Sequence, residues 1–64
     1  MQRGVVTFYD ETKGFGFIQP NDMGTPIFVH RSDLQDRIRL NDSVVYDVEQ
    51  GKKGIHAVNV RVIG

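Results

Sequence analysis

Two short segments gather aromatic side chains: KGFGFI, which begins at Lys13, and IFVH, which ends at His30. The first holds Phe15 and Phe17 between glycines, and the second holds Phe28 two residues before the histidine. Phenylalanine rings can stack on flat ligands, a lysine can contact an anion, and a histidine can stack or donate a hydrogen bond. A small chain normally needs such rings for its core. These residues are therefore either the core or a displayed binding surface.

Strand alternation divides both segments into two faces. In the first, the glycines and Ile18 share one face, and the phenylalanines and Gln19 share the other; in the second, the aliphatic residues oppose Phe28 and His30. Burying Gln19 and His30 without partners would cost about 1–3 kcal/mol each. Three phenylalanines would also crowd a small interior, whereas glycine allows close approach of the backbone. We predict displayed phenylalanines and an aliphatic core; the alternative is a phenylalanine core with glycines facing water.

Five segments have the pattern of short strands bounded by turn residues, and no segment has the apolar period of a helix. The segment 31–42 lacks strand alternation and is predicted to be a loop with at most one helical turn. Five short strands are too few for a sandwich but can close into a small barrel. We predict an all-β fold, a five-stranded antiparallel oligonucleotide-binding barrel, as a single domain over residues 1–64. The expected strands are Gly4–Asp10, Phe15–Gln19, Ile27–His30, Ser43–Glu49 and Ile55–Ile63.

Composition limits the possible functions. Eight basic and eight acidic residues give a net charge of zero, so affinity for nucleic acid must come from stacking and a few well-placed cations. The chain has no cysteine and only two histidines, His30 and His56, so we predict no metal and no cofactor. It also has no nucleophile motif, catalytic carboxylate pair or phosphate-binding loop. We predict no enzyme activity and no small-molecule substrate.

The chain has no apolar run long enough for a signal peptide or a membrane span. We expect a cytoplasmic protein that does not associate with membranes.

The segments KGFGFI and IFVH resemble the two ribonucleoprotein motifs of the cold-shock domain, in the order and spacing of that family. The opening Gly4-Val5-Val6 resembles the family's first strand, and GKKGIHAVNV, ending at Val60, resembles its last hairpin. The resemblance therefore extends over nearly the whole chain. It implies an oligonucleotide-binding barrel that binds single-stranded RNA and DNA and acts as an RNA chaperone and transcription antiterminator.

The resemblance also implies binding positions. Phe8 stands where the family usually has tryptophan, and Tyr9 where it usually has phenylalanine. Phe8 could instead be a core residue if a bulge shifts its face, and Tyr9 suits a barrel rim equally well. Lys13 could be a solvated turn residue, and His30 a structural cross-strand residue. The predicted nucleic-acid-binding residues are Phe8, Tyr9, Lys13, Phe15, Phe17, Phe28, His30 and Arg31.

The chain also departs from the family pattern. Arg31 replaces a frequent phenylalanine, Thr7 replaces a frequent lysine, and the loop between Ser32 and Leu40 is shorter than usual and lacks the aromatic normally found there. Arginine can stack on bases as well as contact phosphate, so Arg31 recovers part of the lost interaction. We expect weaker binding than in aromatic-rich members of the family.

The remaining candidates are interpreted as structural or solvated. Tyr46 alternates with two valines and is assigned a structural role. The rival function is a protein-interaction or self-association module that uses the same exposed aromatics. We expect a monomer, with weak dimerisation as the alternative.

Four cations are interpreted as solvated loop charges, with phosphate steering as the alternative: Arg37, Arg39, Lys52 and Lys53.

Overall fold

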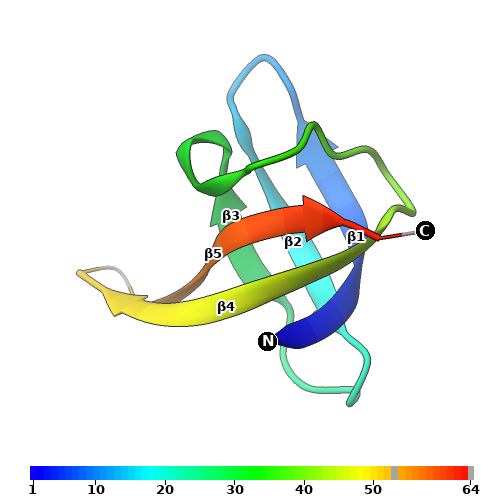
Figure 1. Ribbon diagram of the computed structural model, residues 1–64. Coiled ribbons are helices and arrows are strands. Elements are labelled where there is room, and N and C mark those ends of the chain that lie inside the picture. Colours follow the sequence, from blue (N-terminus) through cyan, green and yellow to red (C-terminus); the bar gives the residue numbers. More distant parts are fainter. Residues whose placement is uncertain (53, 64) are drawn as a thin grey trace.

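The computed structural model describes residues 1–52 and 54–63 and is a closed barrel of strands (Figure 1). A single turn of 3-10 helix, η1 (Arg31–Asp33), follows the third strand, which agrees with the loop predicted at 31–42. All five predicted strands are present, with ends that differ by one or two residues. The strands are β1 (Gln2–Asp10), β2 (Phe15–Pro20), β3 (Ile27–His30), β4 (Ser43–Gly51) and β5 (Gly54–Val62).

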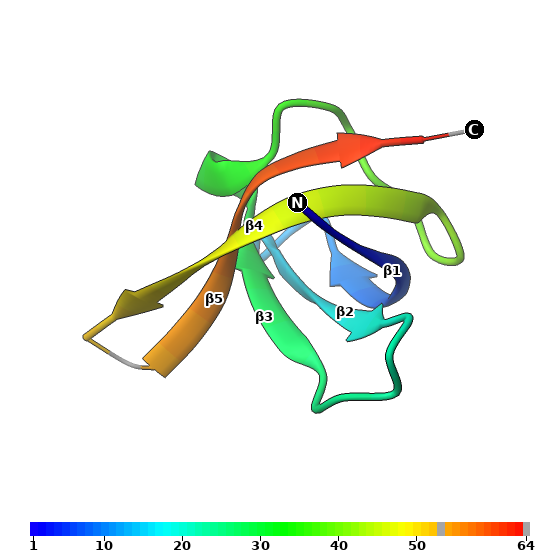
Figure 2. The same ribbon diagram turned by 60° about the horizontal axis from the view of Figure 1, so that its bottom comes forward.

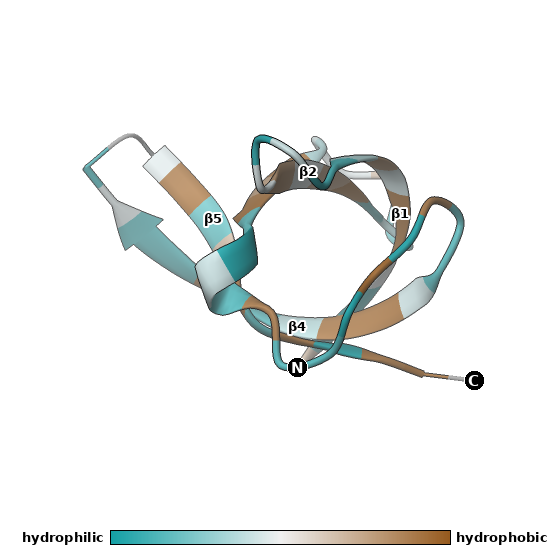
Figure 3. Cartoon of the chain, turned by 90° about the horizontal axis from the view of Figure 1, so that it is seen from above, coloured by the Kyte–Doolittle hydropathy of each residue, from teal (hydrophilic) through white to brown (hydrophobic). Residues whose placement is uncertain are grey.

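Around the barrel the strands follow the order β1-β2-β3-β5-β4, and Figure 3 looks into the closed ring. Four neighbouring pairs are antiparallel, but β3 and β5 run parallel. The prediction of a wholly antiparallel barrel was wrong at this pair. A closed ring with an odd number of strands cannot alternate in direction all the way round, so one neighbouring pair must be parallel.

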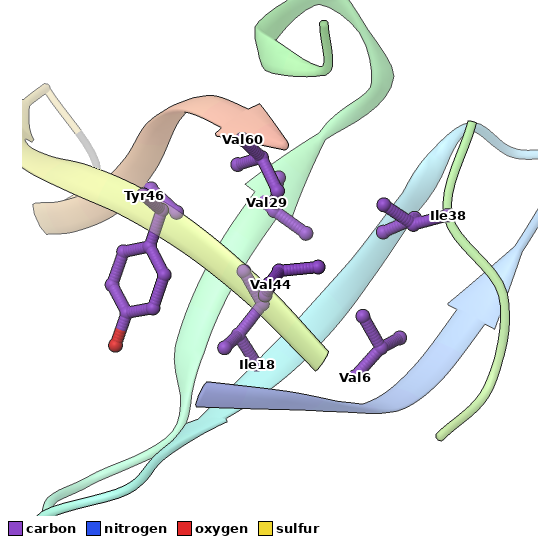
Figure 4. Close-up of a cluster of buried hydrophobic side chains, with 8 residues drawn as sticks. Val6, Ile18, Val29, Ile38, Val44, Tyr46 and Val60 are labelled. Atoms are coloured by element: carbon purple, nitrogen blue, oxygen red, sulfur yellow. The ribbon is translucent and has the colours of Figure 1, made fainter. Parts of the chain in front are cut away.

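The interior of the barrel is mainly aliphatic (Figure 4), as the alternation pattern predicts. Ile18 of β2 and Val29 of β3 are fully buried, and Tyr46 of β4 is buried with them, which confirms its structural assignment. Ile38 enters the core from the loop before β4, so this irregular segment closes part of the barrel. The core residues are Val6, Ile18, Val29, Ile38, Val44, Tyr46, Ala57 and Val60.

Two buried glycines allow β2 to lie close to its neighbours. A Cβ atom on Gly16 would clash with the carbonyl oxygen of Phe8 and would lie 2.8 Å from Cδ1 of Tyr9. Gly14 has a φ of 76°, in the left-handed region that glycine adopts without strain. The glycine face of KGFGFI therefore points inward, and its phenylalanine face points outward.

No helix with the length and hydropathy of a membrane span occurs within residues 1–52 and 54–63.

Candidate nucleic-acid interface

A β-bulge in β1 determines on which side of the strand its aromatic residues, Phe8 and Tyr9, lie. Val6 pairs with Ile18 and Phe8 pairs with Phe17, so Thr7 is an extra residue on β1. Regular alternation would put Phe8 on the inner side with Val6, but the bulge turns it outward, where 45% of it is exposed. The alternative that a bulge makes Phe8 a core residue is therefore wrong, because the bulge moves Phe8 from the inner side of β1 to the outer side.

The same bulge turns Tyr9 inward. Its side chain is half-buried and packs against the core, next to Gly16 of β2. Tyr9 thus lies on the opposite side of β1 from Phe8, and the structure does not bring it together with the other predicted rings. A role for Tyr9 in binding stays a prediction.

Four phenylalanines form a continuous patch on the outside of the barrel, here called the outer aromatic surface: Phe8, Phe15, Phe17 and Phe28. Strand pairing places Phe17 between Phe8 on β1 and Phe28 on β3. The centroids of neighbouring rings lie 5.7 to 6.4 Å apart. The rings of Phe15 and Phe28 are stacked, with an interplanar angle of 21°. Side chains from three strands therefore form one apolar surface that faces solvent.

His30 lies at the edge of the outer aromatic surface, paired with Phe15 on β2. Its Nδ1 atom accepts a hydrogen bond from the backbone N–H of Ser32 at 3.2 Å and lies 2.9 Å from Oγ of the same serine. Because Nδ1 is an acceptor, the neutral ring carries its proton on Nε2. The exposed imidazole can therefore stack on a base or donate from Nε2.

Two of the predicted cations lie at the Gly14 end of this surface. Lys13 is exposed in a tight turn, and its own backbone N–H donates a hydrogen bond to Oδ1 of Asp10 at 3.0 Å. The backbone N–H of Arg31 donates to the carbonyl oxygen of Gly14 at 2.8 Å, and its side chain crosses over that glycine. A Cβ atom on Gly14 would lie 2.7 Å from Cδ of Arg31, so the absence of a side chain there makes room for the arginine. Two exposed cations thus lie next to Gly14, one residue before Phe15.

The loop before β4 carries no aromatic residue. Of its apolar residues, Ile38 is buried in the barrel and Leu40 is exposed, while Arg37 and Arg39 are exposed on either side of Ile38. The loop therefore offers cations to solvent and no stacking ring. Of the other two loop cations, Lys52 is exposed, and Lys53 lies outside the described residues.

A groove that sequence analysis missed adjoins the outer aromatic surface. It is lined by Phe28 and His30 on β3 and by residues of the β4–β5 hairpin. Sequence analysis counted His56 only as a potential metal ligand, but parallel pairing sets it beside Phe28. No local signal reveals this contact, because it depends on the pairing of distant strands. The lining residues, which define the hairpin groove, are Phe28, His30, Gly51, Lys52, Gly54, Ile55 and His56.

Among the described residues, no group of three or more histidine, aspartate or glutamate side chains could hold a metal ion.

Residues 2–63 match the family described as the 'Cold-shock' DNA-binding domain. The chain is 43% identical over 61 residues to the cold shock-like protein CspD of Escherichia coli K12, and the match covers 89% of this chain and 82% of that protein. It is 38% identical over 64 residues to the major cold shock protein of Micrococcus luteus, and this match covers 94% of this chain and 96% of that protein. This chain belongs to the cold-shock domain family, whose members bind nucleic acid.

The fold agrees with this membership. The structure of Drosophila Unr CSD456 superposes on this chain with a TM-score of 0.81 at 23% sequence identity. The match covers 98% of this chain but only 26% of that longer one, and at this identity the likeness shows the fold alone. The barrel is therefore an oligonucleotide-binding fold, as predicted.

Proposed function

We propose that this protein binds single-stranded RNA and DNA on the outer aromatic surface and acts as an RNA chaperone and transcription antiterminator. Residues 1–64 act as one cold-shock domain, in the cytoplasm and as a monomer. The protein binds nucleic acid without catalysing a reaction and without a metal or a cofactor. The proposed binding residues are Phe8, Phe15, Phe17, Phe28 and His30, with Lys13 and Arg31 as phosphate contacts and Tyr9 as a further base contact.

The observation that carries this proposal is the continuous cluster of phenylalanine rings on the outside of a barrel with a filled aliphatic interior. Exposed apolar patches are costly for a small protein and usually mark a binding surface. Each base has a flat π-face, and stacking on an aromatic ring is worth about 1–3 kcal/mol per base with little dependence on sequence. Rings 5.7 to 6.4 Å apart can hold successive bases of one flexible strand.

The charge of the protein sets the expected affinity. Net charge is zero, and two exposed cations, Lys13 and Arg31, lie beside Gly14 at one end of the outer aromatic surface. Stacking therefore supplies most of the binding energy, and the loop before β4 adds no ring to it. We expect binding weaker than in family members that carry phenylalanine at the position of Arg31 and an aromatic residue in this loop.

A titration of labelled oligothymidine and oligouridine at low salt tests the proposal. The triple variant Phe15→Leu, Phe17→Leu, Phe28→Leu keeps apolar bulk and removes stacking, so Kd should rise more than about a hundredfold if each ring contributes at least about 1 kcal/mol. The matched control is Met23→Ala with Leu40→Ala, which changes exposed apolar residues outside the surface and should leave Kd unchanged. Unchanged oligonucleotide affinity in the triple variant, with loss of self-association, would instead support the protein-interaction function.

Chaperone activity needs its own readout. A short RNA hairpin with a fluorophore and a quencher at its ends should open when the wild-type protein is added and stay closed with the triple variant. Binding without opening would limit the function to single-strand binding.

A further inference from the structure

Ser32 holds the ring of His30 at two points. Its backbone N–H donates to Nδ1 of His30 at 3.2 Å, and its Oγ atom lies 2.9 Å from the same nitrogen. Because a backbone N–H can only donate, Nδ1 is an acceptor, and the serine hydroxyl donates to it as well. Within residues 1–52 and 54–63, no other hydrogen bond reaches this ring. The orientation of the imidazole therefore depends on Ser32.

The place of Ser32 is fixed in turn by η1, which continues directly from the end of β3 (Figure 2). The backbone N–H of Leu34 closes this turn by donating to the carbonyl oxygen of Arg31 at 3.2 Å. The N–H of Arg31 donates to the carbonyl oxygen of Gly14 at 2.8 Å, which ties η1 to the residue before β2. Ser32 thus presents its N–H and its hydroxyl to His30 from a turn that is itself anchored.

These contacts select one state of the ring before any ligand binds. An exposed histidine without them has two neutral tautomers and several rotamers. Binding would have to choose among these states, and the lost freedom would weaken the complex. In this protein Nδ1 is turned toward η1 and the proton of the neutral ring is on Nε2. The imidazole therefore offers one N–H donor in one direction.

The rings beside His30 indicate what this donor meets. His30 pairs with Phe15 on β2 and follows Phe28 by two residues on β3, on the same outer face. The stacked rings of Phe15 and Phe28 have centroids 5.9 Å apart. A base stacked on either ring can extend past its edge to the next side chain of that face, which is His30. Phenylalanine has no hydrogen-bond donor, so among these three side chains only His30 can donate to the edge of the base.

We propose that Ser32 is a positioning residue for nucleic-acid binding. It holds His30 in the tautomer whose Nε2–H donates to a carbonyl oxygen of a pyrimidine base stacked on the neighbouring rings. This inference rests on the proposed function and adds to it a residue that does not touch the ligand. Thymine and uracil each carry two carbonyl oxygens, O2 and O4, that can accept such a hydrogen bond.

Oligothymidine titrations at pH 8.0, where histidine is neutral, test the role of Ser32. Ser32→Ala removes the hydroxyl, and Kd should rise roughly two- to fivefold, as expected for the loss of part of one hydrogen bond. Ser32→Thr keeps a hydroxyl at this place and should leave Kd close to that of the wild type. The matched control is Ser43→Ala, which changes the other serine of the chain, exposed at the start of β4. An unchanged Kd in Ser32→Ala would overturn the inference.

A double-variant cycle shows whether Ser32 acts through His30. His30→Ala removes the donor, so Ser32→Ala should have no further effect on Kd in that background. Equal effects of Ser32→Ala with and without His30 would mean that Ser32 acts by another route, and would overturn the inference. Thermal unfolding of each variant controls for changes of the fold.

Nitrogen-15 magnetic resonance of the His30 ring in the free protein gives a readout that a purely structural role would not move. In the wild type at pH 8.0, Nε2 should have the chemical shift of a protonated nitrogen, and Nδ1 that of an unprotonated one. In Ser32→Ala the two shifts should move toward each other as the second tautomer becomes populated, and in Ser32→Thr they should stay apart. A proton on Nδ1 in the wild type, or ring shifts that do not respond to Ser32→Ala, would overturn the inference.

Thio-substituted ligands test the contact with the base. Oligomers of 2-thiothymidine and 4-thiothymidine keep the stacking ring and replace one carbonyl oxygen by sulfur, a weaker acceptor. At pH 7.0, one of the two should raise Kd of the wild type roughly two- to tenfold and should not do so in His30→Ala. The same response of both proteins to both ligands would overturn the inference and leave the proposed function intact. Absence of binding to oligothymidine itself would instead refute the proposed function, whereas the tautomer of the free protein is measured independently of it.

Discussion

The inner and outer faces of β2 and β3 carry different kinds of apolar side chain. Ile18 and Val29 point into the barrel and are fully buried, while Phe17 and Phe28 point outward on the same strands. The smaller aliphatic residues fill a tight interior, and the large flat rings remain available to a ligand. Under the proposed function, stability and recognition are therefore properties of opposite sides of one short stretch of backbone, and substitutions should separate them.

The largest expected effect is on the inner face. Ile18→Ala leaves a cavity among fully buried neighbours and should lower the free energy of unfolding by about 2–5 kcal/mol, a large share of the stability of so small a domain. Chemical denaturation measures the change, and Ile18→Val, with an expected loss of about 0.5–1.5 kcal/mol, keeps the protein folded for comparison. If Ile18→Val weakened oligonucleotide binding without lowering stability, the division between the two faces would fail.

The next effect is on the outer face. Phe17 contacts the rings of Phe8, Phe15 and Phe28, so Phe17→Ala should raise Kd for oligothymidine by about 5- to 150-fold, equivalent to 1–3 kcal/mol. Phe17→Leu should weaken binding while changing the free energy of unfolding by less than about 1 kcal/mol. An unchanged Kd with a large loss of stability would show that Phe17 is a structural residue.

A smaller effect is expected at the edge of the outer aromatic surface. Arg31→Phe exchanges a cation for a ring beside Gly14, so it should flatten the slope of log affinity against log salt by about 0.7 while increasing affinity at high salt. Titrations at several salt concentrations measure both quantities, with Arg39→Phe, in the loop before β4, as the matched control. A slope that stays the same would mean that Arg31 contacts no phosphate.

The smallest effect is on Tyr46, whose hydroxyl is the one polar group among the fully buried side chains of residues 1–52 and 54–63. Among the described residues its hydroxyl has no hydrogen-bond partner, and burial, with a further contribution from the charge of Asp22, raises its pKa above 10.0. Tyr46→Phe removes this unsatisfied group and should raise the free energy of unfolding at pH 7 by about 1 kcal/mol. Oligonucleotide affinity should not change.

The raised pKa of Tyr46 also predicts a pH dependence. Above pH 10 the tyrosine ionises in the unfolded chain but stays protonated in the folded one, so the folded state binds more protons and stability falls as pH rises. Tyr46→Phe should lack this part of the loss when thermal unfolding is followed between pH 9 and 11. Equal losses in the two proteins would show that the hydroxyl is solvated.

The sequence predicts what depends on local pattern. Alternation separates Ile18 from Phe28, and the polar residues Gln19 and His30 on the phenylalanine face predict that Ile18 points inward and Phe28 outward. Turn residues mark the ends of the strands. The resemblance to the cold-shock domain adds Phe8 to the predicted binding residues, whereas simple alternation with Val6 would place Phe8 in the core.

The features that the sequence does not predict depend on contacts between distant segments. The bulge at Thr7 is a change of register against β2, and the parallel β3–β5 pair follows from closing a ring of five strands. The position of His56 beside Phe28 and the entry of Ile38 into the core follow from that closure. Neither position carries a local signal in the sequence.

The central claim is that single-stranded nucleic acid binds across the outer aromatic surface. A chemical-shift titration with hexathymidine or hexauridine tests it directly, because it reports both binding and its location. We predict shifts centred on Phe8, Phe15, Phe17, Phe28 and His30, with little change at Tyr46 and at Asp22 in the β2–β3 loop. Shifts centred on the β1–β4 contact, where Gln2 pairs with Tyr46, or no shifts at a large excess of either oligonucleotide, would contradict the account.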